Sequence, residues 1–164
     1  MILASHIIIS GLLGSQTDNY FLAAAIGFLS HYVLDGIPHW DYLSDEFEAK
    51  AQNNLGFIKS KKFWGEISKV FIDITAGFGL LLILIISIKE DNIIPAIIGA
   101  IFGILPDPLG LFYWMTKLKT LKWNSDIQYF VHHSIHKKIK QKFLPGILVQ
   151  AATIIAIWLI IYFW

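Results

Sequence analysis

Long apolar runs, separated by short polar segments, dominate the chain. The runs comprise residues 2–14, 19–36, 64–88, 93–105 and 145–164. The third and the last are each long enough, as helices, to span a hydrocarbon core of about 30 Å. Apolar runs of this length are typical of helices and too long for strands, so the pattern predicts an all-α protein.

Helix-ending and helix-capping residues divide these runs. Asp18 or Asn19 is suited to cap the second helix, which Gly36 and Pro38 end. The aromatic stretch 109–116 follows two prolines and is typical of an interfacial segment. We therefore predict a polytopic integral membrane helical bundle of about five apolar helices plus an interfacial helical segment, folded as a single domain over residues 1–164.

The composition agrees with this class and limits the chemistry. Of the 164 residues 55% are hydrophobic, which is too many for a soluble domain of this length to cover with polar surface. The net charge of +1 provides no field for nucleic acid, so the expected partners are membrane lipids. The chain has no cysteine, so a bound metal would need nitrogen and oxygen ligands. The oligomeric state is left open.

Lysines give the predicted bundle an orientation. They cluster in residues 50–69 and 117–142, and positively charged loops are retained on the cytoplasmic side. We therefore predict a multi-pass protein of the cell (inner) membrane, with the N-terminus in the cytoplasm and the C-terminus outside. This topology brings the candidate ligands described below to the cytoplasmic face.

The stretch that ends the second apolar run is rich in metal-binding side chains. His31 and Asp35 are four residues apart and share a face of the predicted helix. His39 and Asp41 follow the Gly-Ile-Pro break, which allows the chain to fold back over the helix end. We predict His31, Asp35 and His39 as metal ligands, the alternative being a polar, interfacial helix end.

A second group of histidines lies near the lysine-rich segment. His132 and His136 are four residues apart, the spacing with which two imidazoles on one helix hold one cation, and His133 and His136 are three apart. We predict all three as candidate ligands, while at most one of His132 and His133 can point in the direction of His136. A basic surface helix is the alternative.

Three further ionisable residues lie within or beside apolar helices. Such groups are costly in a membrane and are usually paired or functional. We predict His6 as a ligand because it shares the depth of the other candidates, and Asp107 because two prolines hold it at a helix end. Asp41 or Asp73 is the candidate catalytic general base; for Asp73 a structural ion pair is the alternative.

These motifs resemble those of the membrane-bound metal-dependent hydrolases of prokaryotes. His6 is similar to an early histidine of that family's first apolar helix, Pro106-Asp107 to its Pro-Asp element, and the segment from His132 to His136 around Ser134 to its histidine-rich motif. The resemblance implies a membrane-embedded, helical, metal-dependent hydrolase.

A second, local resemblance concerns the other histidine cluster. His31 with Asp35, followed by Pro38-His39, resembles the His-x3-Asp and Pro-x-His elements of zinc-dependent phospholipases C and single-strand zinc nucleases. Those enzymes are helical phosphodiesterases with several zinc ions, so the resemblance implies a phosphoester substrate.

We therefore predict a metal-dependent hydrolase that cleaves a phosphoester or diphosphate bond of a lipid-like substrate at the cytoplasmic membrane face. Its cofactors are predicted to be divalent cations, Zn²⁺ first, with Mn²⁺ or Mg²⁺ as alternatives. The alternative is a non-enzymatic metal-binding membrane protein, either a metal carrier or a metal-stabilised scaffold. A plain helical anchor for a partner leaves the clustering of the histidines unexplained.

Overall fold

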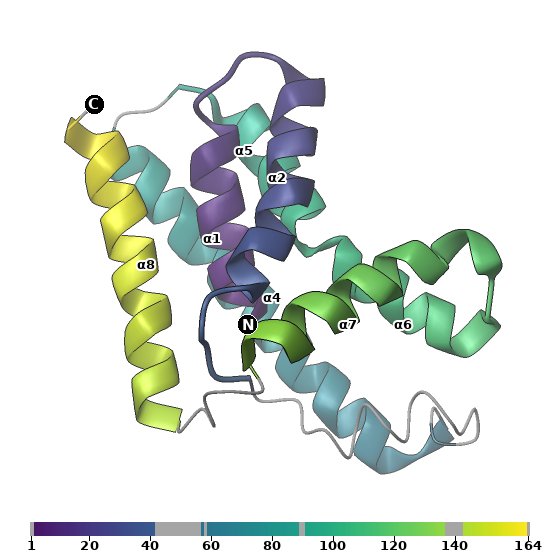
Figure 1. The fold of residues 1–164 in the computed structure, drawn as a ribbon. Coiled ribbons are helices and arrows are strands. Elements are labelled where there is room, and N and C mark those ends of the chain that lie inside the picture. The colour runs from purple at the N-terminus through teal and green to yellow at the C-terminus, as the bar shows by residue number, and fades with distance from the viewer. Residues whose placement is uncertain (1, 42–56, 58, 89–90, 137–142, 164) are drawn as a thin grey trace.

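The computed structural model describes residues 2–41, 57, 59–88, 91–136 and 143–163, and for residues 132–136 it describes the backbone alone. The described chain is helical throughout (Figure 1). The helices are α1 (Leu3–Gly14), α2 (Tyr20–Asp35), α4 (Lys61–Ser87), α5 (Ile93–Ile104), α6 (Pro106–Thr116), the 3₁₀ turn η2 (Lys119–Leu121), α7 (Lys122–His136) and α8 (Phe143–Phe163).

The first helix lies at the centre of the bundle. α1 is apolar on nearly every side, and almost all of its residues are buried. Its Ile7, Ile8 and Leu12 pack with Leu81 of α4 and with residues of α5, and α8 packs against the same cluster. In Figure 1, α1 is accordingly enclosed by α2, α4, α5 and α8, whereas α6 and α7 form a hairpin that projects from the side of the bundle.

Glycine allows α5 to approach α1 and α2 closely. A Cβ atom on Gly99 would collide with the backbone oxygen of Ser10, and one on Gly27 would collide with the backbone of Gly99 itself. Small residues at helix crossings are the usual means of bringing backbones together in membrane proteins. This contact fixes α5 against α1 and α2, the helices that carry three of the predicted ligands.

Three helical runs are long and apolar enough to cross a membrane: Lys61–Ser87, Ile93–Thr116, which joins α5 and α6, and Phe143–Phe163. α1 and α2 are apolar but shorter. Large apolar side chains such as Phe71, Ile86 and Ile160 are exposed on the outer faces. These features are compatible with a membrane protein. The all-α class is confirmed, whereas a count of five spanning helices stays a prediction.

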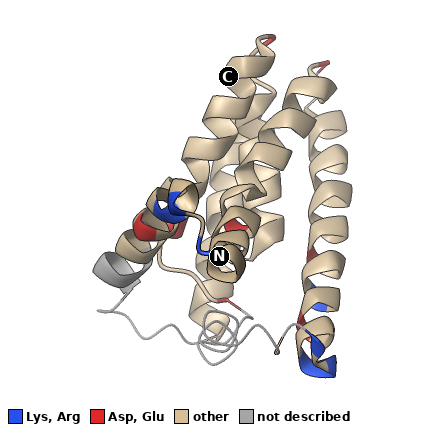
Figure 2. Cartoon of the chain, turned by 90° about the vertical axis from the view of Figure 1, so that its right-hand side faces the viewer, with Lys and Arg blue, Asp and Glu red and all other residues tan. Residues whose placement is uncertain are grey.

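Charged residues distinguish the two ends of the bundle. In Figure 2 the described lysines lie in the lower part of the molecule, on α4 and around the α6–α7 hairpin, and the N-terminus lies in the same part. The loops at the opposite end carry Asp18 and Asp91, and no lysine among the residues that the structure describes there. The bundle is therefore electrostatically asymmetric along its axis.

Local signals predicted most helix ends. Asn19, rather than Asp18, caps α2, because its Oδ1 accepts hydrogen bonds from the amides of Phe21 and Leu22 at 3.0 and 3.1 Å. α2 ends at Asp35, immediately before Gly36, as predicted. The predicted interfacial stretch 109–116 lies in α6, which begins at Pro106. Most of the polar segment 41–62 lies outside the described residues.

Candidate metal centre

Three predicted ligands from two helices meet inside the bundle. His6 of α1 and His31 of α2 each approach the carboxylate of Asp35: His6 Nε2 lies 3.2 Å from Oδ1, and His31 Nε2 lies 3.2 Å from Oδ2. One nitrogen or oxygen atom of each residue lies within 4.8 Å of the others. All three side chains are buried. We call His6, His31 and Asp35 the buried triad.

A hydrogen bond to the backbone of α5 sets the orientation of the His31 ring. Its Nδ1 lies 2.8 Å from the backbone oxygen of Gly103. Because a carbonyl oxygen can only accept, Nδ1 carries the hydrogen, and Nε2 is the atom that faces the carboxylates. A metal-binding histidine is typically held in this way, by a hydrogen bond from its other ring nitrogen.

His6 lies against His31 without such a support. The two rings stack with centroids 4.3 Å apart and planes 24° from parallel. Within the described part of the chain, neither ring nitrogen of His6 has a hydrogen-bond partner, although both atoms are buried. A buried polar atom without a partner is costly and rare. His6 Nε2 thus faces Asp35 Oδ1 at 3.2 Å without a hydrogen bond of regular geometry, and Nδ1 is buried without a partner among the described residues.

Asp107 extends the buried triad towards the outside. It lies in the first turn of α6, and its Oδ1 is 3.4 Å from His31 Nε2. Its side chain retains 39% of its accessible surface, whereas those of His31 and Asp35 are at most 2% exposed. Gln128 of α7 donates from Nε2 to the same oxygen at 3.0 Å. Asp107 thus forms the opening of the site.

A polar network on α7 holds this opening in place. Asn124 donates to the backbone oxygen of Pro106 at 2.9 Å and accepts from the hydroxyl of Tyr32 at 2.6 Å. Gln128 lies over Gly110, where a Cβ atom would collide with its side-chain oxygen. Sequence analysis did not select Asn124, Gln128 or Tyr32. The signal available was the i,i+4 spacing of the two amides on a polar helix, four residues before His132.

The donor set and its spacing are compatible with a divalent cation and also with direct ion pairs, because the contacts of His6 and His31 with Asp35 use both of its oxygens. Tetrahedral coordination with bonds of about 2.0–2.1 Å puts neighbouring ligand atoms about 3.3 Å apart. The nitrogen–oxygen distances here are 3.2, 3.2 and 3.4 Å. With neutral imidazoles, the two carboxylates give the group a formal charge of −2, which one divalent cation balances. A protonated imidazole is the other cation that could offset part of this charge.

The remaining candidates of the first cluster, His39 and Asp41, lie beyond the end of α2. His39 is buried, and its Nδ1 lies 2.7 Å from the backbone oxygen of Ile37, so Nδ1 is again the protonated nitrogen. Asp41 is half-buried. Neither belongs to the group of ligand atoms that converges on Asp35. The roles of His39 as a ligand and of Asp41 as a base stay predictions.

Asp73 contacts the beginning of α1. Its Oδ2 accepts a hydrogen bond from the amide of Ala4 at 3.2 Å, one of the amides that a helix N-terminus leaves without an internal partner. This contact holds the helix that carries His6. A catalytic role for Asp73 stays a prediction.

Gln150 of α8 is a further residue that sequence analysis did not select. Its Oε1 accepts from the amide of Ile2 and the hydroxyl of Ser5, at 3.2 and 3.1 Å. Its Nε2 donates to the backbone oxygen of Trp40 at 2.9 Å. One amide thus joins α8 to the start of α1 and to the segment after α2. A single polar residue in a long apolar helix was the available signal.

The second histidine cluster lies at the end of α7. The backbone of residues 132–136 continues this helix, and position 132 follows Gln128 by four residues. The side chains of His132, His133 and His136 lie outside the described part of the structure, so their assignment as ligands stays a prediction.

Two described lysines pair with carboxylates on their own helices. Lys122 pairs with Asp126 at 2.6 Å, and this hydrogen bond and the charge of Asp126 raise the pKa of Lys122. Lys69 pairs with Glu66 at 2.9 Å. Surface pairs of this kind contribute little to stability.

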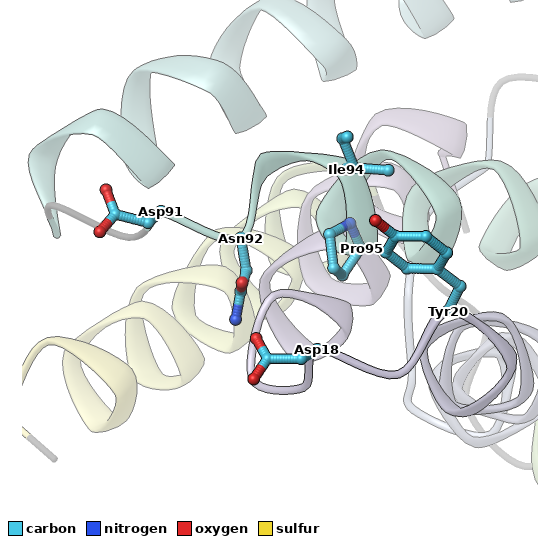
Figure 3. Close-up of a pocket in the computed structure, with 6 residues that line it drawn as sticks. All are labelled: Asp18, Tyr20, Asp91, Asn92, Ile94 and Pro95. Atoms are coloured by element: carbon cyan, nitrogen blue, oxygen red, sulfur yellow. The ribbon is translucent and has the colours of Figure 1, made fainter.

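The end of the bundle opposite the buried triad, which we call the far end, has a hollow of about 180 Å³. Figure 3 shows the residues that line it. The six residues are Asp18, Tyr20, Asp91, Asn92, Ile94 and Pro95. Asn92 donates to the backbone oxygen of Ser15 at 3.0 Å, which links the two loops. None of the predicted ligands lies here.

Comparisons with protein-family models, with curated proteins and with solved structures found no match. The resemblance to metal-dependent hydrolases therefore stays a prediction.

Proposed function

We propose that this chain is a membrane-bound, metal-dependent hydrolase that cleaves a phosphoester or diphosphate bond of a lipid-like substrate. The observation that carries the proposal is the buried triad with Asp107 at its edge. Nitrogen and oxygen atoms at ligand spacing come from three buried side chains and from Asp107, whose side chain is 39% exposed. A catalytic metal site differs from a structural one by a coordination position that substrate can reach, and the exposure of Asp107 supports such a position here.

The chain's own residues have distinct tasks in this proposal. His6, His31, Asp35 and Asp107 would hold a divalent cation, Zn²⁺ in this proposal, with Mn²⁺ or Mg²⁺ as alternatives. Such a cation lowers the pKa of bound water and offsets the negative charge that develops on an attacked phosphate. Gly103 orients His31, and Gln128 orients Asp107. The general base would be Asp41 or Asp73.

The location of the site favours a substrate from the membrane. The buried triad lies in the first turns of α1 and the last turns of α2, near one end of an apolar bundle. Lysines of α4 and of the α6–α7 hairpin lie in the same part of the molecule (Figure 2). By the positive-inside rule this end is proposed to face the cytoplasm of the inner membrane, with the C-terminus outside, and its charge would attract anionic headgroups.

A metal-stabilised scaffold is the second candidate, and one observation favours it. His6, His31 and Asp35 are almost fully buried, as the ligands of a closed structural site are. The half-exposed carboxylate of Asp107 favours the enzyme instead. A metal carrier is favoured less, because the ligands lie near one end rather than at the midplane, where transporters bind their cargo.

Chelator-sensitive turnover of phosphoesters tests the proposal. The purified protein, in detergent, should hydrolyse at least one member of a panel of phospholipids and isoprenoid phosphates, and a chelator should abolish the activity. Asp35→Asn should be inactive, while Asp18→Asn, at the far end, should retain full activity. A folded, metal-loaded protein that leaves the whole panel intact would favour the scaffold. Cleavage of an amide or carboxylic ester would retain the metal hydrolase and contradict the phosphate assignment.

A further inference from the structure

An open apolar groove runs between α2 and α5 on the outer face of the bundle. Its volume is about 390 Å³, within the range of about 300–1,000 Å³ usual for small-molecule pockets. The lining residues are Ala24, Ala25, Phe28, Leu29, Phe102 and Leu105. None of these side chains is charged or can form a hydrogen bond. We call this feature the α2–α5 groove.

One end of the groove lies near the opening of the metal centre. On α2 the ring of Phe28 contacts that of Tyr32, and the ring of Tyr32 contacts that of His31, each with centroids 5.5 Å apart. On the other wall, Leu105 lies two residues before Asp107, the half-exposed carboxylate beside His31. From Ala24 to His31 the helix rises by about 10 Å. The end of the groove that Phe28 and Leu105 line is thus within about one helical turn of His31 and Asp107.

We propose that the α2–α5 groove holds one acyl chain of a membrane phospholipid and thereby directs the phosphate to the metal centre. This inference rests on the proposed function and names its substrate class. A hydrocarbon chain needs no hydrogen-bond partner, so an entirely apolar lining suits it. The two alanines leave room that larger side chains would fill. The cation that His31, Asp35 and Asp107 would hold complements the phosphate at the end of the groove.

An aromatic residue at the same end supports this placement of the headgroup. Trp123, at the start of α7, lies against Phe28 with ring centroids 6.1 Å apart and is about half-exposed. Tryptophan is enriched at the level of lipid headgroups. The chain of a lipid would thus lie along Phe28, and its headgroup would lie beside Trp123 and Asp107.

Photo-crosslinking tests the groove without requiring activity. The full chain is placed in nanodiscs that contain phosphatidylglycerol with a diazirine on one acyl chain, and the labelled peptides are mapped after irradiation. We expect residues 24–29 and 102–105 to be labelled at least about threefold more than the lipid-facing residues of α8. Ala25→Trp should remove this excess, and the milder Ala25→Leu should reduce it. Ala76→Trp, which enlarges an exposed alanine of α4, should preserve it.

Even labelling of all outer faces would overturn the groove as a lipid site. Labelling absent from the groove, in a protein that is dimeric by its mass in the nanodisc, would overturn it as well, because a second copy would then cover this face. Equal metal contents in wild type and both tryptophan variants verify that the variants are folded.

Kinetics separate this inference from the proposed function. With phosphatidylglycerol as substrate, Ala25→Trp should raise KM at least about tenfold, while a water-soluble phosphodiester without acyl chains should be cleaved at the wild-type rate. Unchanged lipid kinetics in Ala25→Trp would overturn the groove and leave the hydrolase intact. If no phosphoester is cleaved, the hydrolase fails, and the crosslinking result still decides whether the groove binds lipid.

Discussion

The two ends of the bundle carry similar residue types but use them differently. At the far end Asp18 and Asp91 lie in loops, and both are exposed. At the near end Asp35 is buried between two imidazoles, and Asp107 is held by Gln128. An exposed carboxylate needs no partner because water solvates it, whereas a buried one must be neutralised. Burial and convergence, rather than the presence of carboxylates, therefore distinguish a candidate site from a polar loop.

The largest expected difference between the ends is their exposure to opposite sides of the membrane. The chain has no cysteine, so Asp18→Cys and Lys59→Cys each introduce a single thiol at an exposed position. In intact cells a membrane-impermeant maleimide should label Asp18→Cys and leave Lys59→Cys unlabelled until the cells are permeabilised. The opposite pattern would reverse the orientation, and labelling of both would contradict a membrane-spanning bundle.

The next largest effect is expected from the carboxylates. Asp35→Asn should lower metal affinity by more than about 100-fold, because loss of a ligand should exceed the 10–100-fold effect of losing a residue that only orients one. Asp18→Asn, the matched change at the far end, should leave the affinity unchanged. Elemental analysis after dialysis against defined free zinc measures both. Wild-type protein purified without chelator and free of metal would contradict the metal centre itself.

Removing the metal should lower the thermal stability of a protein changed at the far end, but not that of a protein changed in the buried triad. A ligand that binds only the folded state at 1,000 times its Kd adds about 4 kcal/mol to the free energy of unfolding. Chelator should therefore lower the thermal midpoint of wild type and of Asp18→Asn, with recovery when zinc is restored. Asp35→Asn should show no response to chelator. An equal response in all three proteins would indicate that the chelator acts elsewhere.

The fold was largely predictable, because its signals are local. Continuous apolar runs predict helices wherever they occur, and Asn19 and Gly36 act on the backbone beside them. The site was partly predictable. The lysine bias placed His6 at the same end as His31 and Asp35, so their meeting follows from topology. The contacts of Gln150 with Ile2 and Trp40 depend on helix packing, which no local pattern encodes.

Sequence spacing does not decide whether His132 or His133 is the ligand, but the helical register of α7 favours one of them. Position 132 is one turn beyond Gln128, which contacts Asp107. Position 133 is rotated about the helix axis by about 100° from position 132, away from Asp107. We therefore expect His132→Ala to lower metal affinity by about 100-fold, because loss of a ligand should cost at least as much as loss of a residue that orients one. His133→Ala should change it less than about twofold. Equal effects of the two substitutions, measured by competition with a zinc-binding dye, would contradict this choice.

The smallest expected effect concerns the residue that joins α7 to the opening of the site. Gln128 contacts Asp107 but, in the proposed centre, does not itself bind the cation. Residues that orient ligands usually contribute about 10-fold or more to metal affinity, so Gln128→Ala should lower it by about 10-fold. Ile127→Ala, a change at the preceding and exposed position of the same helix, should have no effect. Faster metal release in Gln128→Ala, with an unchanged thermal midpoint of the metal-free protein, would show that the amide acts on the carboxylate. A lowered midpoint with unchanged release would instead show that Gln128 only attaches the hairpin to the bundle.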